Sequence, residues 1–152
     1  MAEIPLPEPV NIADCPEHAC VYEASTMDGR VNFADCFGVG YGTQSASDYN
    51  YYGAVNRMTI TTSNCCDVLT DAVSKANGTY PETMVHSTSQ VVCMGSDDSS
   101  CGGDFGTPIY CKSFDTNEYV LVAALTSAPC TSGDPILAND LTGGAFGAYL
   151  NQ

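Results

Sequence analysis

Basic residues are scarce in this chain. Its 152 residues include four Lys and Arg against 18 Asp and Glu, which gives a formal net charge of −14. Nucleic acids and anionic bilayers attract cationic surfaces, so the composition argues against both as partners. It permits cationic partners and metal ions, but the acidic residues are scattered along the chain, which favours a role in solubility.

Long apolar runs are also missing, and no segment approaches the roughly 20 apolar residues that a membrane-spanning helix needs. The first residues, MAEIPLPEPV, lack a basic start and an apolar core, so no secretory signal is predicted there. The chain is therefore expected to be cytosolic or a mature form whose signal has been removed. Its length and its apolar fraction of 44% suit one domain with a hydrophobic core.

Metal-binding patterns are absent as well. The sequence has no CxxC, and its two histidines, His18 and His86, are far apart, so neither a metal site nor a cofactor is expected. The nine cysteines instead predict disulfides formed in an oxidising compartment. The sequon Asn77-Gly78-Thr79 predicts glycosylation at Asn77 and also favours secretion. Because nine is odd, at least one cysteine is free or bonded to another chain.

The chain divides into an extended connector over residues 1–30, rich in Pro, Glu and Asp, and a domain over residues 31–152. Strands are predicted over 58–62 (MTITT), 84–93 (MVHSTSQVVC) and 119–125 (YVLVAAL), the last continuous enough to be buried on both faces.

A short helix is predicted between a cap at Asn64 and a stop at Asn77-Gly78. Its apolar face would consist of Val68, Leu69, Ala72, Val73 and Ala76. A weaker helical pattern over 141–150 (LTGGAFGAYL) contains three glycines, each unfavourable by about 1 kcal/mol relative to alanine. These elements predict a mostly β domain, a small barrel or a sandwich.

Residues 101–111, CGGDFGTPIYC, resemble the CxGDSGGPLxC signature of the chymotrypsin-like serine proteases. Four further segments resemble that family in the same order along the chain, over residues 30–152. They are CFGVGYG at 36–42, similar to CxxxGWG; SNCC at 63–66 before the predicted helix; VVCMG at 91–95, similar to VCAG; and the apolar strand ending in LTS at 125–127, with Cys130 close behind.

The resemblance implies an all-β fold, the six-stranded antiparallel Greek-key barrel that forms the C-terminal half of a trypsin-like protease. A short intermediate helix and a short C-terminal helix would accompany it. The implied disulfides join Cys36 to Cys111, Cys93 to Cys65 or Cys66, and Cys101 to Cys130. Among the remaining cysteines, Cys15 and Cys20 either bond to each other or leave one to tether another part of the molecule.

Departures from the family pattern predict that the chain is not an enzyme. Phe105 occupies the position of the nucleophile, and a phenyl ring has no lone pair with which to attack a carbonyl. Gly103, Asp104 and Phe105 would form a vestigial oxyanion loop. The family's general-base motif is missing, and His18 and His86 are interpreted as solvated or structural. The first barrel, which carries that base, has no counterpart.

The specificity pocket has changed too. By resemblance Ser99 lies at its base and Ser127 on its wall, while Ala128-Pro129 replaces the family's Trp-Gly. Proline lacks the backbone donor that would pair with an extended peptide. A vestigial, partly filled cleft is expected, with Phe105 as its plug.

A second barrel without the first would expose an apolar face, so a protein partner is expected. The favoured partner is a separate chain that carries the first barrel, disulfide-linked through Cys15 or Cys20 or held without a bond; self-association is the alternative. In active relatives the counterpart of Asp104 pairs with a freshly cut N-terminal amine. Here that amine would come from the partner, or Asp104 would be hydrogen-bonded locally.

The predicted function is therefore that of a secreted, non-catalytic serine protease homologue that binds proteins. The alternative is an abundant structural subunit of an extracellular assembly, without a ligand-binding cleft. An enzyme of another kind is disfavoured, because no cluster has catalytic spacing. Asp97-Asp98, beside Asp104, is interpreted as a solvated loop and not a cation site.

Overall fold

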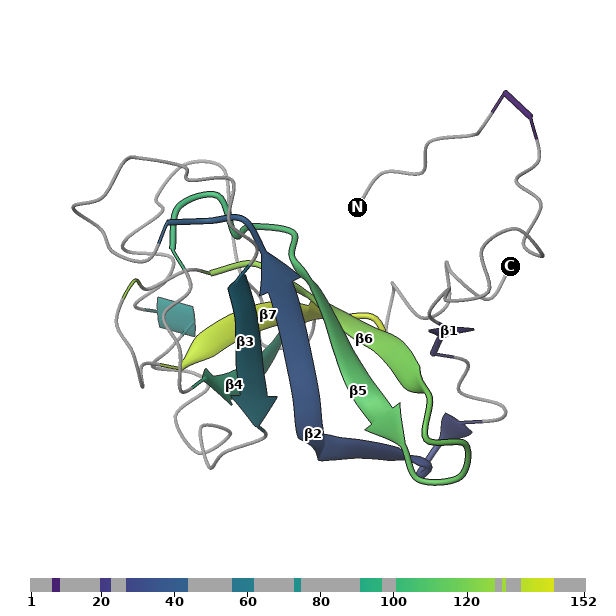
Figure 1. The fold of residues 1–152 in the computed structure, drawn as a ribbon. Coiled ribbons are helices and arrows are strands. Elements are labelled where there is room, and N and C mark those ends of the chain that lie inside the picture. The colour runs from purple at the N-terminus through teal and green to yellow at the C-terminus, as the bar shows by residue number, and fades with distance from the viewer. Residues whose placement is uncertain are drawn as a thin grey trace.

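The fold is all-β in the part of the chain described by a computed structural model (Figure 1). That part comprises residues 7–8, 20–22, 27–43, 56–61, 73–74, 91–96, 101–127, 130 and 135–143. The strands are β1 (Cys20–Val21), β2 (Val31–Gly40), β3 (Asn56–Thr61), β4 (Val91–Ser96), β5 (Pro108–Ser113), β6 (Tyr119–Leu125) and β7 (Ile136–Asp140). Within these ranges no helix is both long and apolar enough to span a bilayer.

Strands β2 to β7 form one curled antiparallel sheet. Starting at β2, the pairings run through β3, β4, β7, β6 and β5, and β5 pairs again with β2. Because β6 pairs with both β5 and β7, the sheet curls until its pairings close on themselves. The short strand β1 adds to β6 in parallel, with Cys20 opposite Val120.

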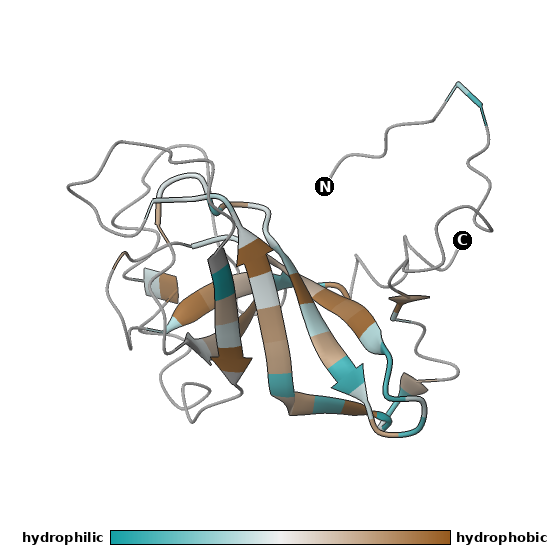
Figure 2. Ribbon diagram, in the orientation of Figure 1, coloured by the Kyte–Doolittle hydropathy of each residue, from teal (hydrophilic) through white to brown (hydrophobic). Residues whose placement is uncertain are grey.

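The hydrophobic core lies inside this curl. Successive side chains of a strand point to opposite faces. In the central parts of β2, β3 and β5, every second residue is buried. Apolar and polar residues are accordingly interspersed along these strands in Figure 2. The largest fully buried side chains of the main core are Met58, Ile60, Ile109, Val122 and Ile136.

The predicted strands agree with the fold in part. Residues 119–125 form β6 with the predicted bounds, and the strand predicted over 58–62 is β3, which begins two residues earlier. The expectation that 119–125 is buried on both faces was wrong, since Tyr119, Leu121 and Ala124 are only half-buried on the outer face. Of the strand predicted over 84–93, residues 91–93 belong to β4 and residues 84–90 lie outside the described ranges.

A second, smaller cluster lies on the other face of β4 and β7. Val91 and Cys93 pack there with Leu137 and Val73, whereas Met94 and Ile136 point into the main core. Residues 73 and 74 are helical, and the remainder of the helix predicted between Asn64 and Asn77 is outside the described part of the chain. At the C-terminus, residues 141–143 form a bend instead of the start of a helix, and residues 144–150 are also outside it.

Two disulfides confirm pairings implied by the resemblance. Cys36–Cys111 joins β2 to β5 across a registered pair, and Cys101–Cys130 joins residues that are 29 positions apart. The third implied pairing, of Cys93 with Cys65 or Cys66, stays a prediction, because Cys65 and Cys66 lie outside the described residues, as Cys15 does. Cys20 is half-buried and forms no disulfide with any described cysteine.

The segment that follows β1 is attached to the barrel. The Tyr22 N–H donates to the Leu121 carbonyl at 3.2 Å, and the Tyr22 ring belongs to the main core. Burial raises the pKa of the Tyr22 phenol, and the carboxylates of Asp28 and Asp140 raise it further.

Strand β2 contains an irregular segment near its start. Its register with β5 shifts between Asn32 and Cys36, and the three intervening residues, 33–35, are all exposed. The extra residues bend β2, as Figure 1 shows at the bottom of the sheet. Cys36 therefore faces inward and reaches Cys111.

Candidate functional site

The site is built on the loop that precedes β5, residues 101–107. Two consecutive turns form it: the Asp104 N–H donates to the Cys101 carbonyl and the Thr107 N–H donates to the Asp104 carbonyl, both at 3.0 Å. The third position of each turn is a glycine with a positive φ, 96° at Gly103 and 83° at Gly106. A type II turn requires this conformation at that position, which glycine adopts without a steric penalty.

The carboxylate of Asp104 is buried under the end of β2. The side chain is 3% exposed. Its Oδ1 accepts a hydrogen bond from the Gly42 N–H at 2.8 Å, and its Oδ2 accepts one from the Cys101 N–H at 3.0 Å. Both oxygens thus have a backbone donor, as a buried carboxylate needs.

Two glycines make room for this carboxylate. A Cβ atom added at either Gly40 or Gly42 would overlap the Asp104 side chain. The Thr43 N–H also donates to the Gly102 carbonyl at 3.0 Å, so the segment after β2 and the loop before β5 hold each other. The Gly-Tyr-Gly sequence at 40–42 therefore has a packing reason independent of any family resemblance.

The far side of the loop is anchored to β6. The Gly106 N–H donates to the Leu125 carbonyl at 2.7 Å, and the Leu125 N–H donates to the Thr107 carbonyl at 2.9 Å. With the Cys101–Cys130 disulfide, these bonds fix both ends of the loop. The position of residue 105 is accordingly determined by the backbone around it.

Phe105 lies at the outer tip of this loop. It is 37% exposed, whereas Asp104 before it and Thr107 after it are buried. Of the predicted vestigial oxyanion loop, Gly103 and Phe105 are thus on the surface and Asp104 points inward. The expectation that Phe105 plugs a partly filled cleft stays a prediction, because Ser99, Ala128 and Pro129 of that cleft lie outside the described residues.

Ser127 occupies a structural position at the end of β6. It is 5% exposed, and its Oγ accepts a hydrogen bond from the Leu137 N–H at 2.8 Å. The N–H groups of Thr126 and Ser127 both donate to the Leu137 carbonyl, at 2.8 and 3.1 Å. Ser127 therefore helps to join the strand end to β7.

Several residues singled out by the sequence lie outside the described ranges. They are Ser99, Ala128 and Pro129 of the predicted pocket, Asn77 of the sequon, His18, His86, Asp97 and Asp98. Among the residues that are described, no group of three His, Cys, Asp or Glu side chains is arranged to hold a metal ion. Chemically, the described loop presents a rigid backbone, an inward carboxylate and an outward phenyl ring.

A group of side chains on the outer face of the sheet was missed by the sequence reasoning. The Phe37 ring contacts the rings of Tyr110 and Tyr119 there, and the Arg57 guanidinium lies over the Phe37 ring. The alternation in strands β2 and β5 was the available signal, because Phe37 and Tyr110 are each next to a buried cysteine.

When the sequence is compared with protein-family models and with curated proteins, none matches it.

Proposed function

We propose that this chain is a non-catalytic relative of the trypsin-like serine proteases that acts by binding protein. The single observation that carries the proposal is Phe105: the loop that resembles the family's nucleophile loop is tightly held, yet it presents a phenyl ring. Hydrolysis by nucleophilic attack needs a hydroxyl or thiol activated by a base, and a phenyl ring supplies neither.

The strand order supports the fold assignment within this proposal. Strands β5, β2, β3 and β4 are neighbours in that order, so the fourth of these strands along the chain lies beside the first. A Greek key has this spatial order, so the order supports the proposed assignment. The Cys36–Cys111 and Cys101–Cys130 bridges are consistent with the same assignment.

The partner in this proposal is a separate chain that carries the first barrel. Asp104 adds no support for an amine from this partner, because its two oxygens are hydrogen-bonded locally to the N–H groups of Gly42 and Cys101, as the second expectation for it stated. A covalent link through Cys20 is compatible with its partial exposure and its thiol. The two disulfides favour secretion into an oxidising compartment.

Replacing the phenyl ring with a nucleophile tests the absence of catalysis. Phe105→Ser is expected to give no hydrolysis of peptide or ester substrates by the chain alone, because the family's general-base motif is missing from its sequence. The Phe105→Ser chain should unfold at nearly the same midpoint temperature as the parent chain, which would show that the loop is intact. Hydrolysis by the assembly would mean that the partner supplies a base, and hydrolysis by the chain alone would refute the proposal.

Native mass spectrometry tests the partner. The chain isolated from its source is expected in a complex with a second, different polypeptide, and reducing conditions will show whether a disulfide holds it. A monodisperse monomer from that source would contradict binding as the function.

A further inference from the structure

The outer face of β3, β2, β5 and β6 carries a continuous group of aromatic and basic side chains. These strands are side by side in Figure 1 and consecutive in the sheet. Phe37 of β2 is directly opposite Tyr110 of β5, with ring centroids 5.6 Å apart, and its ring meets that of Tyr119 edge-on at 4.8 Å. We call Phe37, Arg57, Tyr110, Lys112 and Tyr119 the outer patch.

Two of the chain's four basic residues belong to this patch. The Arg57 guanidinium lies 4.7 Å from the centre of the Phe37 ring, and Lys112 is opposite Tyr119 in the register of β5 and β6. Arg57 is exposed, while Lys112 and the three rings are half-buried. The guanidinium is thus positioned over a ring and not free to move in solvent.

The four strands that form this face contain one acidic residue among them. Strands β3, β5 and β6 contain no Asp or Glu, and the one acid in β2, Asp35, belongs to the exposed irregular segment 33–35. Within these four strands the outer patch carries positive charge, whereas the chain as a whole has a net charge of −14. It can attract carboxylates although the molecule as a whole repels anions.

The composition of the patch is that of a protein interface centre. Tyr, Phe and Arg are enriched in such centres, where a few rigid aromatic and guanidinium groups supply most of the binding energy. Nucleic acid is a poor candidate for this face, since four basic residues cannot offset the repulsion of a phosphate polymer by 18 acids. Sheet stabilisation explains the ring pairs, but it does not account for the two basic residues on the same face.

We infer that the outer patch is a docking surface for a protein partner that places Asp or Glu side chains against Arg57 and Lys112. The inference rests on the proposed function, in which the chain acts by binding protein, and it specifies where the partner binds and what chemistry it presents. The aromatic rings form the apolar centre of the contact, and the two basic groups select an acidic complement.

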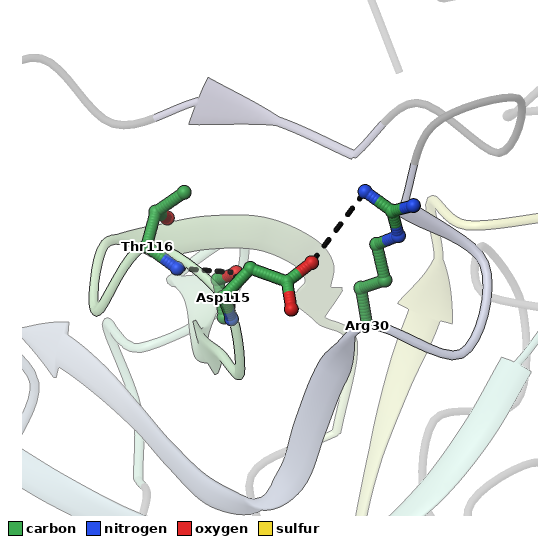
Figure 3. Close-up of polar contacts among 4 residues, drawn as sticks. Arg30, Asp115 and Thr116 are labelled. Carbon is green, nitrogen blue, oxygen red and sulfur yellow. Dashed lines mark hydrogen bonds and ion pairs between the residues drawn. The ribbon is translucent and has the colours of Figure 1, made fainter.

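Charge reversal tests the electrostatic part. The full chain carrying Arg57→Glu or Lys112→Glu is recovered with its native assembly. Each substitution is expected to reduce the amount of partner retained by about tenfold. Arg30→Glu is the control, because Arg30 is also basic and exposed but its charge is already paired with that of Asp115 (Figure 3). Retention in this control should change by less than about twofold. Each variant is first shown to keep its thermal unfolding midpoint.

Site-specific photo-cross-linking tests the location. A photoreactive residue replaces Thr59, which is exposed on β3 opposite Phe37, or Ser74, which is exposed next to Val73 of the smaller cluster at β4 and β7. The Thr59 position is expected to cross-link a partner segment rich in Asp and Glu, and the Ser74 position is not.

Four outcomes separate the two proposals. Cross-links from position 59 to an acidic segment of the partner support the docking surface if they are lost when Arg57→Glu is introduced. Cross-links from position 59 to this chain itself would replace the partner with a second copy. A partner that cross-links only elsewhere, or is retained equally in Arg57→Glu and Lys112→Glu, overturns the surface but leaves the proposed function standing. A chain that is monomeric in its native source overturns both.

Discussion

Two aspartates lie beyond opposite ends of β5, and they differ in burial and in the groups that they contact. Asp104, before the strand, is 3% exposed and accepts hydrogen bonds from the N–H groups of Gly42 and Cys101. Asp115, after it, pairs with Arg30 at 3.5 Å, and both side chains are more than half exposed (Figure 3). The buried carboxylate uses fixed backbone donors, whereas the exposed one uses a mobile side chain.

The difference shows which of the two regions depends on precise packing. Removal of a partner from a buried charge leaves an uncompensated group in a medium that solvates it poorly. Loss of an exposed ion pair returns both groups to water at little free-energy change. The loop before β5 should therefore tolerate substitution far less than the loop after it, although both loops are short.

The largest effect is expected where the space for Asp104 is removed. Gly42→Ala places a methyl group on the carboxylate and should lower the free energy of unfolding by about 3 kcal/mol. Chemical denaturation with a fluorescence or circular dichroism signal measures this. Gly143→Ala is the control, because its added Cβ would meet its nearest atom, an Asp140 oxygen, at 3.7 Å. Equal effects of the two substitutions would contradict the packing described at Gly42.

A smaller effect is expected when Asp104 keeps its shape but loses its charge. Asp104→Asn retains one carbonyl oxygen and turns an NH2 group toward a backbone N–H, so the unfolding free energy should fall by about 2 kcal/mol. The same change at Asp115 should alter it by less than about 0.5 kcal/mol. Urea titrations of the two asparagine variants compare the sites directly, and a larger loss at Asp115 would reverse the assignment of their roles.

The smallest effect extends the comparison to Tyr22, a buried group that is neutral at physiological pH. Burial and the carboxylates of Asp28 and Asp140 raise the pKa of this phenol above its ordinary value of 10.0. Its contribution to stability is therefore complete below about pH 10 and is lost as the pH rises through the folded-state pKa. Stability measured against pH should fall less steeply above pH 10 in Tyr22→Phe than in the parent chain. An unchanged slope would show that Tyr22 ionises equally easily in the folded and unfolded states.

The strands with regular patterns could be predicted from sequence, and the irregular ones could not. Residues 119–125 form a short continuous apolar run that gave β6 its bounds, because such a run is a local property of the chain. Strand β2 contains the irregular segment 33–35, which interrupts its alternation, so its pattern alone did not identify it. The burial of β6 on one face only depends on which strands and segments pack against it, and that is not local.

The sequence by itself determined the charge imbalance, the phenyl ring at position 105 and the spacing of the cysteines that form Cys36–Cys111 and Cys101–Cys130. Only the tertiary structure decided what Asp104 contacts, because its donor at Gly42 is 62 residues away and the two meet only when β2 pairs with β5. The outer patch also exists only in the tertiary structure. Phe37, Arg57, Tyr110 and Tyr119 come from four strands, and the sheet register alone places an aromatic and basic surface on an acidic protein.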